Sequence, residues 1–306
     1  MKIYLNNVKE SWIIDRLRSD WYSYNNSISV SSSYFADIIW IISPWVWEKL
    51  SKKQLSKKFV VCTIHHVDFE KFNKEEEKNF YERDKFVDFY HVISSKTKNQ
   101  IQKLTNKKIV TLPFWVDPNI WFPLESRKSL KKNYGFEEKD FVVGSFQRDT
   151  ESSDLKSPKL IKGPDIFLKI AEEMHKSNKN TKILLTGKNR NYLIENLNKK
   201  CIPFKYLEMV DLNKLNELYN ILDLYVVSSR VEGGPQAILE CAASKTPIVS
   251  TDVGIASEIL HKDSIYSPGT FNKATPNVDY AFNSVQKYFL PNYMNEFIEM
   301  FEKNYK

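Results

Sequence analysis

Short apolar runs rich in β-branched residues alternate along this chain with charged segments of helical periodicity. Two of these runs, DIIWII at 37–42 and KFVVCTI at 58–64, are almost continuously apolar, as expected of parallel strands buried on both faces. The alternation predicts parallel sheets wrapped by helices. The expected strands are 2–5, 37–42, 59–64, 89–94, 109–112, 141–145, 182–185, 204–207, 224–227 and 247–250; the expected helices are 10–22, 45–55, 74–87, 96–104, 165–174, 191–198, 212–219 and 235–243.

A proline and a charge run interrupt this rhythm between residues 121 and 136. With 306 residues, of which 42% are apolar, the chain is long enough for two domains. We therefore expect an α/β fold of two doubly wound domains, over 1–123 and 124–278, that face each other across a cleft. Ligands should lie at the carboxyl ends of the strands. A helical segment over 279–306, broken at Pro291, completes the chain.

Several classes of protein are disfavoured by composition. The longest apolar stretch, 36–47, contains Ser43 and Pro44 and falls short of the roughly 20 residues that span a bilayer. The start MKIYLNN lacks the apolar region of a signal peptide, so a cytoplasmic location is expected. The three cysteines are far apart within apolar runs, which indicates buried reduced thiols rather than disulfides or a zinc site.

The net charge of +7 favours an anionic partner, which could be a nucleic acid, a phosphorylated small molecule or an acidic membrane. Only seven of the 45 basic residues are Arg, whereas proteins that read duplexes rely on Arg for bidentate base contacts. The sequence also lacks an RNA-binding signature and zinc-finger spacing. We therefore expect no nucleic-acid partner.

Residues 45–59, WVWEKLSKKQLSKKF, combine aromatic and leucine side chains with lysines, among them Lys52, Lys53, Lys57 and Lys58. Such a pattern could form a membrane-surface helix, which would give a peripheral contact with an acidic inner membrane surface. An amphipathic helix packed on a sheet, with a solvated lysine face, explains the same pattern and is the favoured interpretation.

The most informative stretch, SSRVEGGPQAILECAASKTPIVSTDVG, covers 228–254. Glu232 follows an expected strand in a loop that we take to be exposed, and Gly233 and Gly234 come next. Pro235 then suits the first turn of a helix. Glycines let a ligand approach the backbone, and free amides at a helix start attract phosphate or sugar oxygens. This predicts a cradle for anions and hydroxyls.

At 100° per residue, Gln236 and Glu240 share one face of the expected helix, while Ile238 and Cys241 point largely the other way. Glu240 therefore need not be buried and could accept hydrogen bonds from a diol. Glu232 could hold the hydroxyls of a second ring. In the alternative interpretation Glu232 only caps the helix and Glu240 is a solvated surface residue.

The complete stretch resembles the donor-binding motif of family 4 retaining glycosyltransferases, which have the GT-B fold. In that motif two glutamates are separated by seven residues, with Gly after the first, and Glu232 and Glu240 keep this spacing. Gly144, Arg148 and the pair Lys162-Gly163 resemble the family's Gly-Arg and Lys-Gly signature, whose cations hold the donor diphosphate. Here the loop between these elements, at 147–163, is longer than usual.

The resemblance extends to other segments of the chain. ILLTG at 183–187 resembles the family's strand that ends in Gly, which implies that Gly187 and Lys188 reach the cleft. The same comparison places Tyr206 and Met209 beside the nucleobase. VVCTIHH resembles the strand whose final His faces the donor sugar, and His65 takes that position. The neighbouring His66 points to the opposite face of a strand, so no metal site is expected there.

The resemblance implies transfer of a hexosyl group from a UDP- or GDP-linked sugar to a hydroxyl of a glycan, lipid or other acceptor, with retention of configuration. Arg148 and Lys162 would stabilise the leaving group, Glu232 and the 233–236 backbone the sugar, Glu240 the ribose, and His65 the sugar from the other domain. The terminal helices would pack back on the first domain. No Asp-x-Asp motif occurs, so we expect neither metal nor cofactor. The alternatives are a noncatalytic sugar-nucleotide-binding protein, an epimerase on the same fold and a basic nucleic-acid-binding module.

Overall fold

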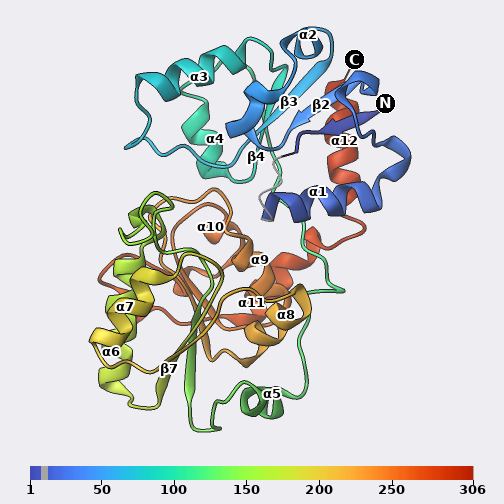
Figure 1. Ribbon diagram of the computed structural model, residues 1–306. Coiled ribbons are helices and arrows are strands. Elements are labelled where there is room, and N and C mark those ends of the chain that lie inside the picture. Colours follow the sequence, from blue (N-terminus) through green and yellow to red (C-terminus); the bar gives the residue numbers. More distant parts are fainter. Residues whose placement is uncertain (8–12, 306) are drawn as a thin grey trace. The chain divides into compact units, whose positions relative to one another are not determined.

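The computed structural model describes residues 1–7 and 13–305, so the first part of the helix expected at 10–22 lies outside the described residues. The chain divides into two compact units (Figure 1). The first comprises Met1–Trp115 and Leu290–Lys306, and the second comprises Val116–Phe289. The sequence interpretation placed the divisions after 123 and 278. In the structure, residues 116–123 and 279–289 belong to the second unit instead.

The first unit contains a parallel sheet of β1 (Ile3–Leu5), β2 (Ile38–Ile41), β3 (Phe59–Ile64), β4 (Phe89–Val92) and β5 (Lys108–Thr111). The α/β class is confirmed, and these strands lie where the apolar runs predicted them. Their spatial order follows the chain, β1-β2-β3-β4-β5, so the winding of this sheet never reverses. This detail differs from the doubly wound arrangement expected for the first domain.

The helices of the first unit are α1 (Ile13–Tyr24), α2 (Lys52–Leu55), α3 (Lys74–Asp84), α4 (Ser95–Ile101) and α12 (Met294–Asn304). The helix expected over 45–55 is wrong. A 3₁₀ helix at Pro44–Lys49 and the single turn of α2 replace it, because Val46 has non-helical torsions and Leu50 is extended. Trp47 and Leu55 are buried in the core, so neither side chain can serve a membrane-surface helix. Trp45 is 51% exposed.

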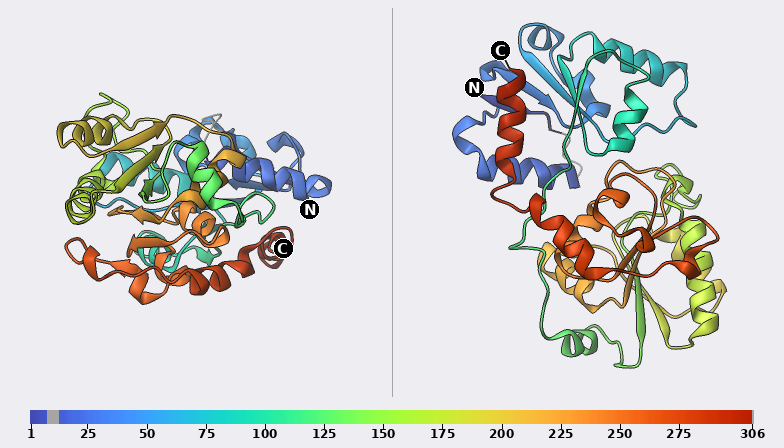
Figure 2. Two further views of the ribbon diagram at one scale, coloured as in Figure 1. Left: turned by 90° about the horizontal axis from the view of Figure 1, so that it is seen from below. Right: turned by 180° about the vertical axis from the view of Figure 1, so that it is seen from behind.

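Helices α1 and α12 cover the face of this sheet that carries Trp40 and His91. Helix α12 is the red helix beside the blue strands in the right-hand view of Figure 2. Trp40 of β2 has its ring centroid 5.4 Å from that of Trp21 and 5.2 Å from that of Phe301. His91 of β4 lies 5.4 Å from Phe297 in the same way. The carboxyl-terminal helix thus completes the core of the amino-terminal sheet.

A chain of buried hydrogen bonds crosses this face. Trp40 Nε1 donates to Thr63 Oγ1 at 2.8 Å, and the Thr63 hydroxyl lies 2.9 Å from His91 Nδ1. His91 Nε2 lies 2.7 Å from the Leu112 carbonyl, which can only accept, so Nε2 carries the proton and Nδ1 accepts from Thr63. Burial lowers the pKa of His91 to about 4, and the imidazole is therefore neutral at pH 7.

The second unit contains β6 (Phe141–Ser145), β7 (Thr181–Thr186), β8 (Phe204–Leu207), β9 (Leu224–Val227), β10 (Ile248–Thr251) and β11 (Ile265–Tyr266), all parallel. The short β11 was not expected. The spatial order is β11-β10-β9-β6-β7-β8, so the winding reverses between β6 and β9. Ligands of doubly wound sheets bind beside such a reversal, at the carboxyl ends of the strands.

The second unit's helices are α5 (Arg127–Asn133), α6 (Pro164–Ser177), α7 (Asn191–Lys199), α8 (Leu212–Ile221), α9 (Gln236–Ala243), α10 (Ala256–Ile259) and α11 (Val278–Val285). Among the described residues, no helix has the length and apolar composition that a membrane crossing requires. The cysteines are free; Cys62 and Cys241 are buried as expected, but Cys201, in the turn after α7, is exposed.

The neutral state of His91 predicts a stability that falls on mild acidification. Between pH 7 and pH 5 this histidine, with a pKa near 6.5, becomes protonated in the unfolded chain. In the folded chain His91 stays neutral over the same range. Replacing His91 by Gln should therefore remove about 2 kcal/mol of the pH-dependent change in unfolding free energy. Urea unfolding at pH 5, 6 and 7 measures this. An unchanged pH slope in the variant would contradict the assignment.

Candidate functional site

The site begins at a close approach between α6 and the end of β9. Gly163, just before α6, has φ +62°, and a Cβ at this position would lie 1.8 Å from the Ser228 carbonyl oxygen. No side chain fits there. The absence of one lets the 3₁₀ helix Leu160–Lys162 lie against the segment that follows β9.

This approach brings two predicted site residues into direct contact, although 70 positions separate them in the chain. Lys162 Nζ forms an ion pair with Glu232 Oε1. The side chain of Lys162 is 20% exposed and that of Glu232 is 11% exposed. The expectation that Glu232 lies in an exposed loop is therefore wrong, because pairing with Lys162 holds its carboxylate against the protein.

Gln147 joins the same cluster and was not recognised in the sequence. Its Nε2 donates to the Lys162 carbonyl at 2.8 Å. The Ser229 hydroxyl lies 3.1 Å from Gln147 Oε1 and 3.1 Å from Glu232 Oε1. Thr251, at the end of β10, donates its hydroxyl to the Ser229 carbonyl at 2.6 Å. The carboxyl ends of β6, β9 and β10 are thereby tied to Lys162 and Glu232.

The Gly233-Gly234 bend lies against the turn after β10. Gly254 has φ +50°, and a Cβ there would lie 2.2 Å from the Gly233 carbonyl oxygen. Pro235 occupies the cap position, and α9 begins at Gln236, one residue later than expected. Gly254 thus packs against the predicted cradle of Gly233, Gly234, Pro235 and Gln236. This contact was not identified in the sequence; the only indication was that Gly254 follows an expected strand.

Glu240 lies differently from its expected position. It is 5% exposed, and Tyr219 of α8 donates its hydroxyl to Glu240 Oε2 at 2.7 Å. Burial, and next the charge of Glu240, raise the pKa of Tyr219, which keeps this hydroxyl a donor. The prediction that Glu240 need not be buried is wrong, because its side chain lies against Tyr219 of α8. Its contact with a ribose stays a prediction.

The remaining predicted donor residues of this unit lie within or just after β6, β7 and β8. Gly144 is within β6, and a Cβ there would lie 2.4 Å from Leu222 Cδ1. Arg148 donates from Nη1 to Ser152 Oγ at 3.0 Å. Gly187 has φ +92°, and its carbonyl accepts from the Tyr206 hydroxyl at 3.0 Å. Tyr206 therefore braces the turn after β7.

Lys188 and Met209 are both exposed. Met209 lines a cavity of about 570 Å³ at the end of β8, together with Tyr134, Leu207, Glu208, Val210 and Lys214. A role of this cavity in base binding stays a prediction.

His65 lies in the first unit, at the end of β3. Its Nε2 lies 2.9 Å from the Ile42 carbonyl, so that nitrogen carries a proton. Its ring contacts those of Trp45 and Phe114, at centroid distances of 5.7 and 5.9 Å. Burial lowers the pKa of His65 to about 4, so at pH 7 the ring is neutral and Nδ1 can only accept a hydrogen bond.

Comparison with known proteins finds a matching family model over part of the chain and solved structures of similar fold. Residues 155–274 match the family described as Glycosyl transferases group 1. The sequence matches none of the curated proteins. The match lies over the second unit, where the Lys162–Glu232 cluster is found, and it confirms the resemblance to family 4 glycosyltransferases that the motifs indicated.

Solved structures share the fold of nearly the whole chain. HepE of Anabaena in complex with UDP is similar with a TM-score of 0.75 at 14% identity, over 99% of this chain and 100% of that chain. Sucrose-phosphate synthase from Thermosynechococcus elongatus has a TM-score of 0.70 at 12% identity, over 97% and 80%. The pneumococcal O-GlcNAc transferase GtfA has a TM-score of 0.66 at 15% identity, over 98% of this chain and 61% of that chain. These likenesses confirm the GT-B fold of two Rossmann-like domains.

The close approach at Gly163 predicts a specific cost for adding a methyl group. Gly163→Ala should cost more stability than Gly269→Ala, because both positions have positive φ but nothing lies within 4 Å of a Cβ at Gly269. The left-handed backbone alone costs about 1–2 kcal/mol in both variants. Thermal unfolding of the two proteins measures the difference. Equal melting temperatures would show that the contact with Ser228 is not tight.

Proposed function

From the family match and the GT-B fold, we propose that this chain is a glycosyltransferase that moves a sugar from a nucleotide diphosphate sugar to an acceptor hydroxyl. The observation that carries the proposal is the Lys162–Glu232 contact at the carboxyl ends of strands, beside the winding reversal. A cation and a hydroxyl-binding carboxylate side by side suit the diphosphate and the sugar of one donor. HepE, of the same fold, was crystallised with UDP-glucose, which supports a UDP-linked donor; GDP stays an alternative.

In this proposal Lys162 and Arg148 neutralise the charge that builds on the leaving nucleotide. Glu232 and the 233–236 backbone hold the sugar hydroxyls, and Glu240 accepts from the ribose. His65 contacts the sugar through Nδ1 as an acceptor. We nominate no carboxylate of the amino-terminal strands as a nucleophile, so retention would proceed by attack on the same face, guided by the leaving phosphate. No metal takes part.

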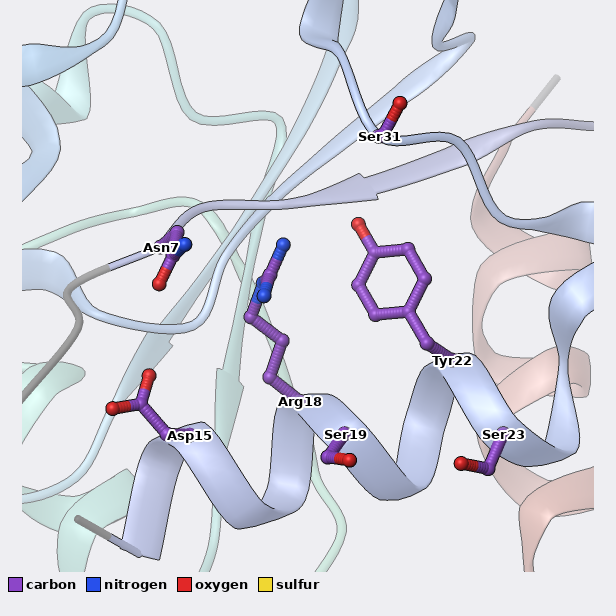
Figure 3. Close-up of a pocket in the computed structure, with 7 residues that line it drawn as sticks. All are labelled: Asn7, Asp15, Arg18, Ser19, Tyr22, Ser23 and Ser31. Carbon is purple, nitrogen blue, oxygen red and sulfur yellow. The ribbon is translucent and has the colours of Figure 1, made fainter. Parts of the chain in front are cut away.

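The first unit supplies a candidate acceptor pocket of about 620 Å³ between α1 and the β1 end (Figure 3). It is lined by Asn7, Asp15, Arg18, Ser19, Tyr22, Ser23 and Ser31. Arg18 is held by a hydrogen bond of its Nε to the Leu5 carbonyl at 3.4 Å and lies 4.8 Å from the Tyr22 ring centroid.

The lining contains one acidic side chain, Asp15, and one basic side chain, Arg18, so their formal charges cancel. Hydroxyl groups and one amide supply both hydrogen-bond donors and acceptors. A neutral polyhydroxylated acceptor fits such a lining better than an anion or an apolar chain does. We therefore propose a glycan-like acceptor here.

The proposal predicts separate effects at the two paired residues. Lys162→Ala should weaken UDP or GDP binding about 10- to 100-fold, since a charge-assisted hydrogen bond contributes about 1.5–3 kcal/mol. Isothermal titration calorimetry measures the affinity. Lys128→Ala, which removes a surface lysine paired with Glu138 in the same unit, is the matched control and should bind normally. Unchanged affinity in Lys162→Ala would refute the phosphate contact.

Glu232→Gln keeps the size of the side chain but removes its charge. It should abolish sugar transfer while leaving the affinity for the bare nucleoside diphosphate within about threefold, because the carboxylate is assigned to the sugar. Product formation from labelled donor, followed by chromatography, is the measurement. Turnover near that of the unaltered protein would discard the assigned role.

Metal independence is also testable. Transfer should continue unchanged in excess EDTA, since the cationic side chains supply the charge that a metal would supply. A loss of activity that Mn²⁺ or Mg²⁺ restores would contradict this expectation.

A further inference from the structure

Arg190, at the start of α7, is a charged side chain that is wholly buried in the second unit. Its Nε donates to Asp149 Oδ2 at 2.8 Å. Its Nη1 donates to the carbonyl of Ser145, the last residue of β6, at 2.7 Å and to that of Thr186, the last residue of β7, at 3.0 Å. One guanidinium thus joins the carboxyl ends of two neighbouring strands.

The backbone around Arg190 reinforces this connection. Asn189, with φ +58°, accepts at its carbonyl from the amides of Asp149 and Thr150, at 3.0 and 3.1 Å, and from the Thr150 hydroxyl at 2.9 Å. The Asp149 carbonyl accepts from the Lys159 amide at 2.8 Å. The turn after β6, the turn after β7 and the long loop that leads to Lys162 are therefore tied at one point.

A contribution to stability alone does not explain the ion pair between Arg190 and Asp149. Burial raises the pKa of Asp149 and lowers that of Arg190, and each partner's charge opposes the shift of the other. Arg190 Nη2 is buried without a hydrogen-bond partner among the described residues. Buried pairs of this kind often stabilise a protein no better than apolar side chains of equal size.

What the pair does achieve is geometric. Arg148 directly precedes Asp149, and Gly187 directly follows Thr186. Both are predicted donor contacts, and both lie in turns whose neighbouring residues are held by Arg190. A shift of the turn after β6 would displace Arg148, and a shift of the turn after β7 would displace Gly187, relative to a diphosphate bound beside Lys162.

We propose that Arg190 is a positioning residue that, through Asp149 and the ends of β6 and β7, holds Arg148 and the Gly187 turn in the geometry that binds the donor diphosphate. The proposal rests on the proposed function, because it assigns Arg190 an effect on donor binding. It adds a residue that the sequence motifs do not contain.

The test compares a double variant with a matched control, both made in the 306-residue chain. Arg190→Met combined with Asp149→Leu removes both charges and leaves neither orphaned. We expect at least a tenfold weaker affinity for UDP, or for GDP if that is the nucleotide bound, and a raised KM for the donor with an unchanged KM for the acceptor. Arg127→Met breaks the pair with Asp223 before β9, at the opposite strand ends, and should bind nucleotide normally.

Two further measurements keep the result interpretable. Arg190→Lys preserves the charge but cannot reach both carbonyls and the carboxylate, so it should recover part of the lost affinity; it also replaces the double variant if that protein does not fold. Hydrogen exchange should show faster exchange of the Asp149 and Thr150 amides in the variants than in the unaltered chain.

Unaltered affinity together with unaltered exchange in the double variant would overturn the proposal, as would a loss of affinity in Arg127→Met of equal size. Failure of the unaltered chain to bind any nucleoside diphosphate would instead refute the proposed function. In that case the exchange of the Asp149 and Thr150 amides still decides whether Arg190 holds the loop.

Discussion

The ion pair between Lys162 and Glu232 is the contact on which the interpretation of the second unit depends. It exists because Gly163 lets a 3₁₀ turn approach the Ser228 carbonyl more closely than any side chain would permit. Ser229 and Gln147 then surround the pair with hydrogen bonds from neighbouring strand ends. A cation and a carboxylate are thus held together at the edge where parallel sheets bind ligands.

The same unit combines these chemical groups with a frame that carries no predicted ligand contact of its own. Arg190 connects β6 and β7, Thr251 connects β10 to Ser229, and Tyr219 holds Glu240. Each connection runs from a buried side chain to a backbone carbonyl or a carboxylate within or near the predicted site. Binding geometry in such a site is set by neighbours that never touch the ligand.

Much of the fold was predictable because parallel strands that are buried on both faces consist of continuous apolar runs in the sequence. The bounds expected for β3, β6, β8 and β9 agree with the structure. The failure at 45–55 has a physical cause: two tryptophans and two leucines at near-helical spacing resemble an amphipathic helix, but Val46 and Leu50 leave helical torsions. Local spacing contains no information on where tertiary packing breaks a helix.

The site was predictable in its residues and not in its contacts. Helical periodicity predicted that Glu240 and Gln236 share a face, but not that Glu240 contacts Tyr219. The clash distances at Gly163 and Gly254 involve segments far away in the chain, and Arg190 reads in the sequence as an ordinary loop charge. Such facts depend on which loops the fold brings together, and a single sequence does not record that.

The most direct measurement is a crystal structure of the chain with a nucleoside diphosphate bound. We predict that the β-phosphate contacts Lys162 Nζ and lies beside the Gly233-Gly234 bend, with Glu232 free to turn toward the sugar position. A nucleotide bound elsewhere on the molecule, or a crystal soaked at millimolar concentration with no nucleotide at this corner, would contradict the account.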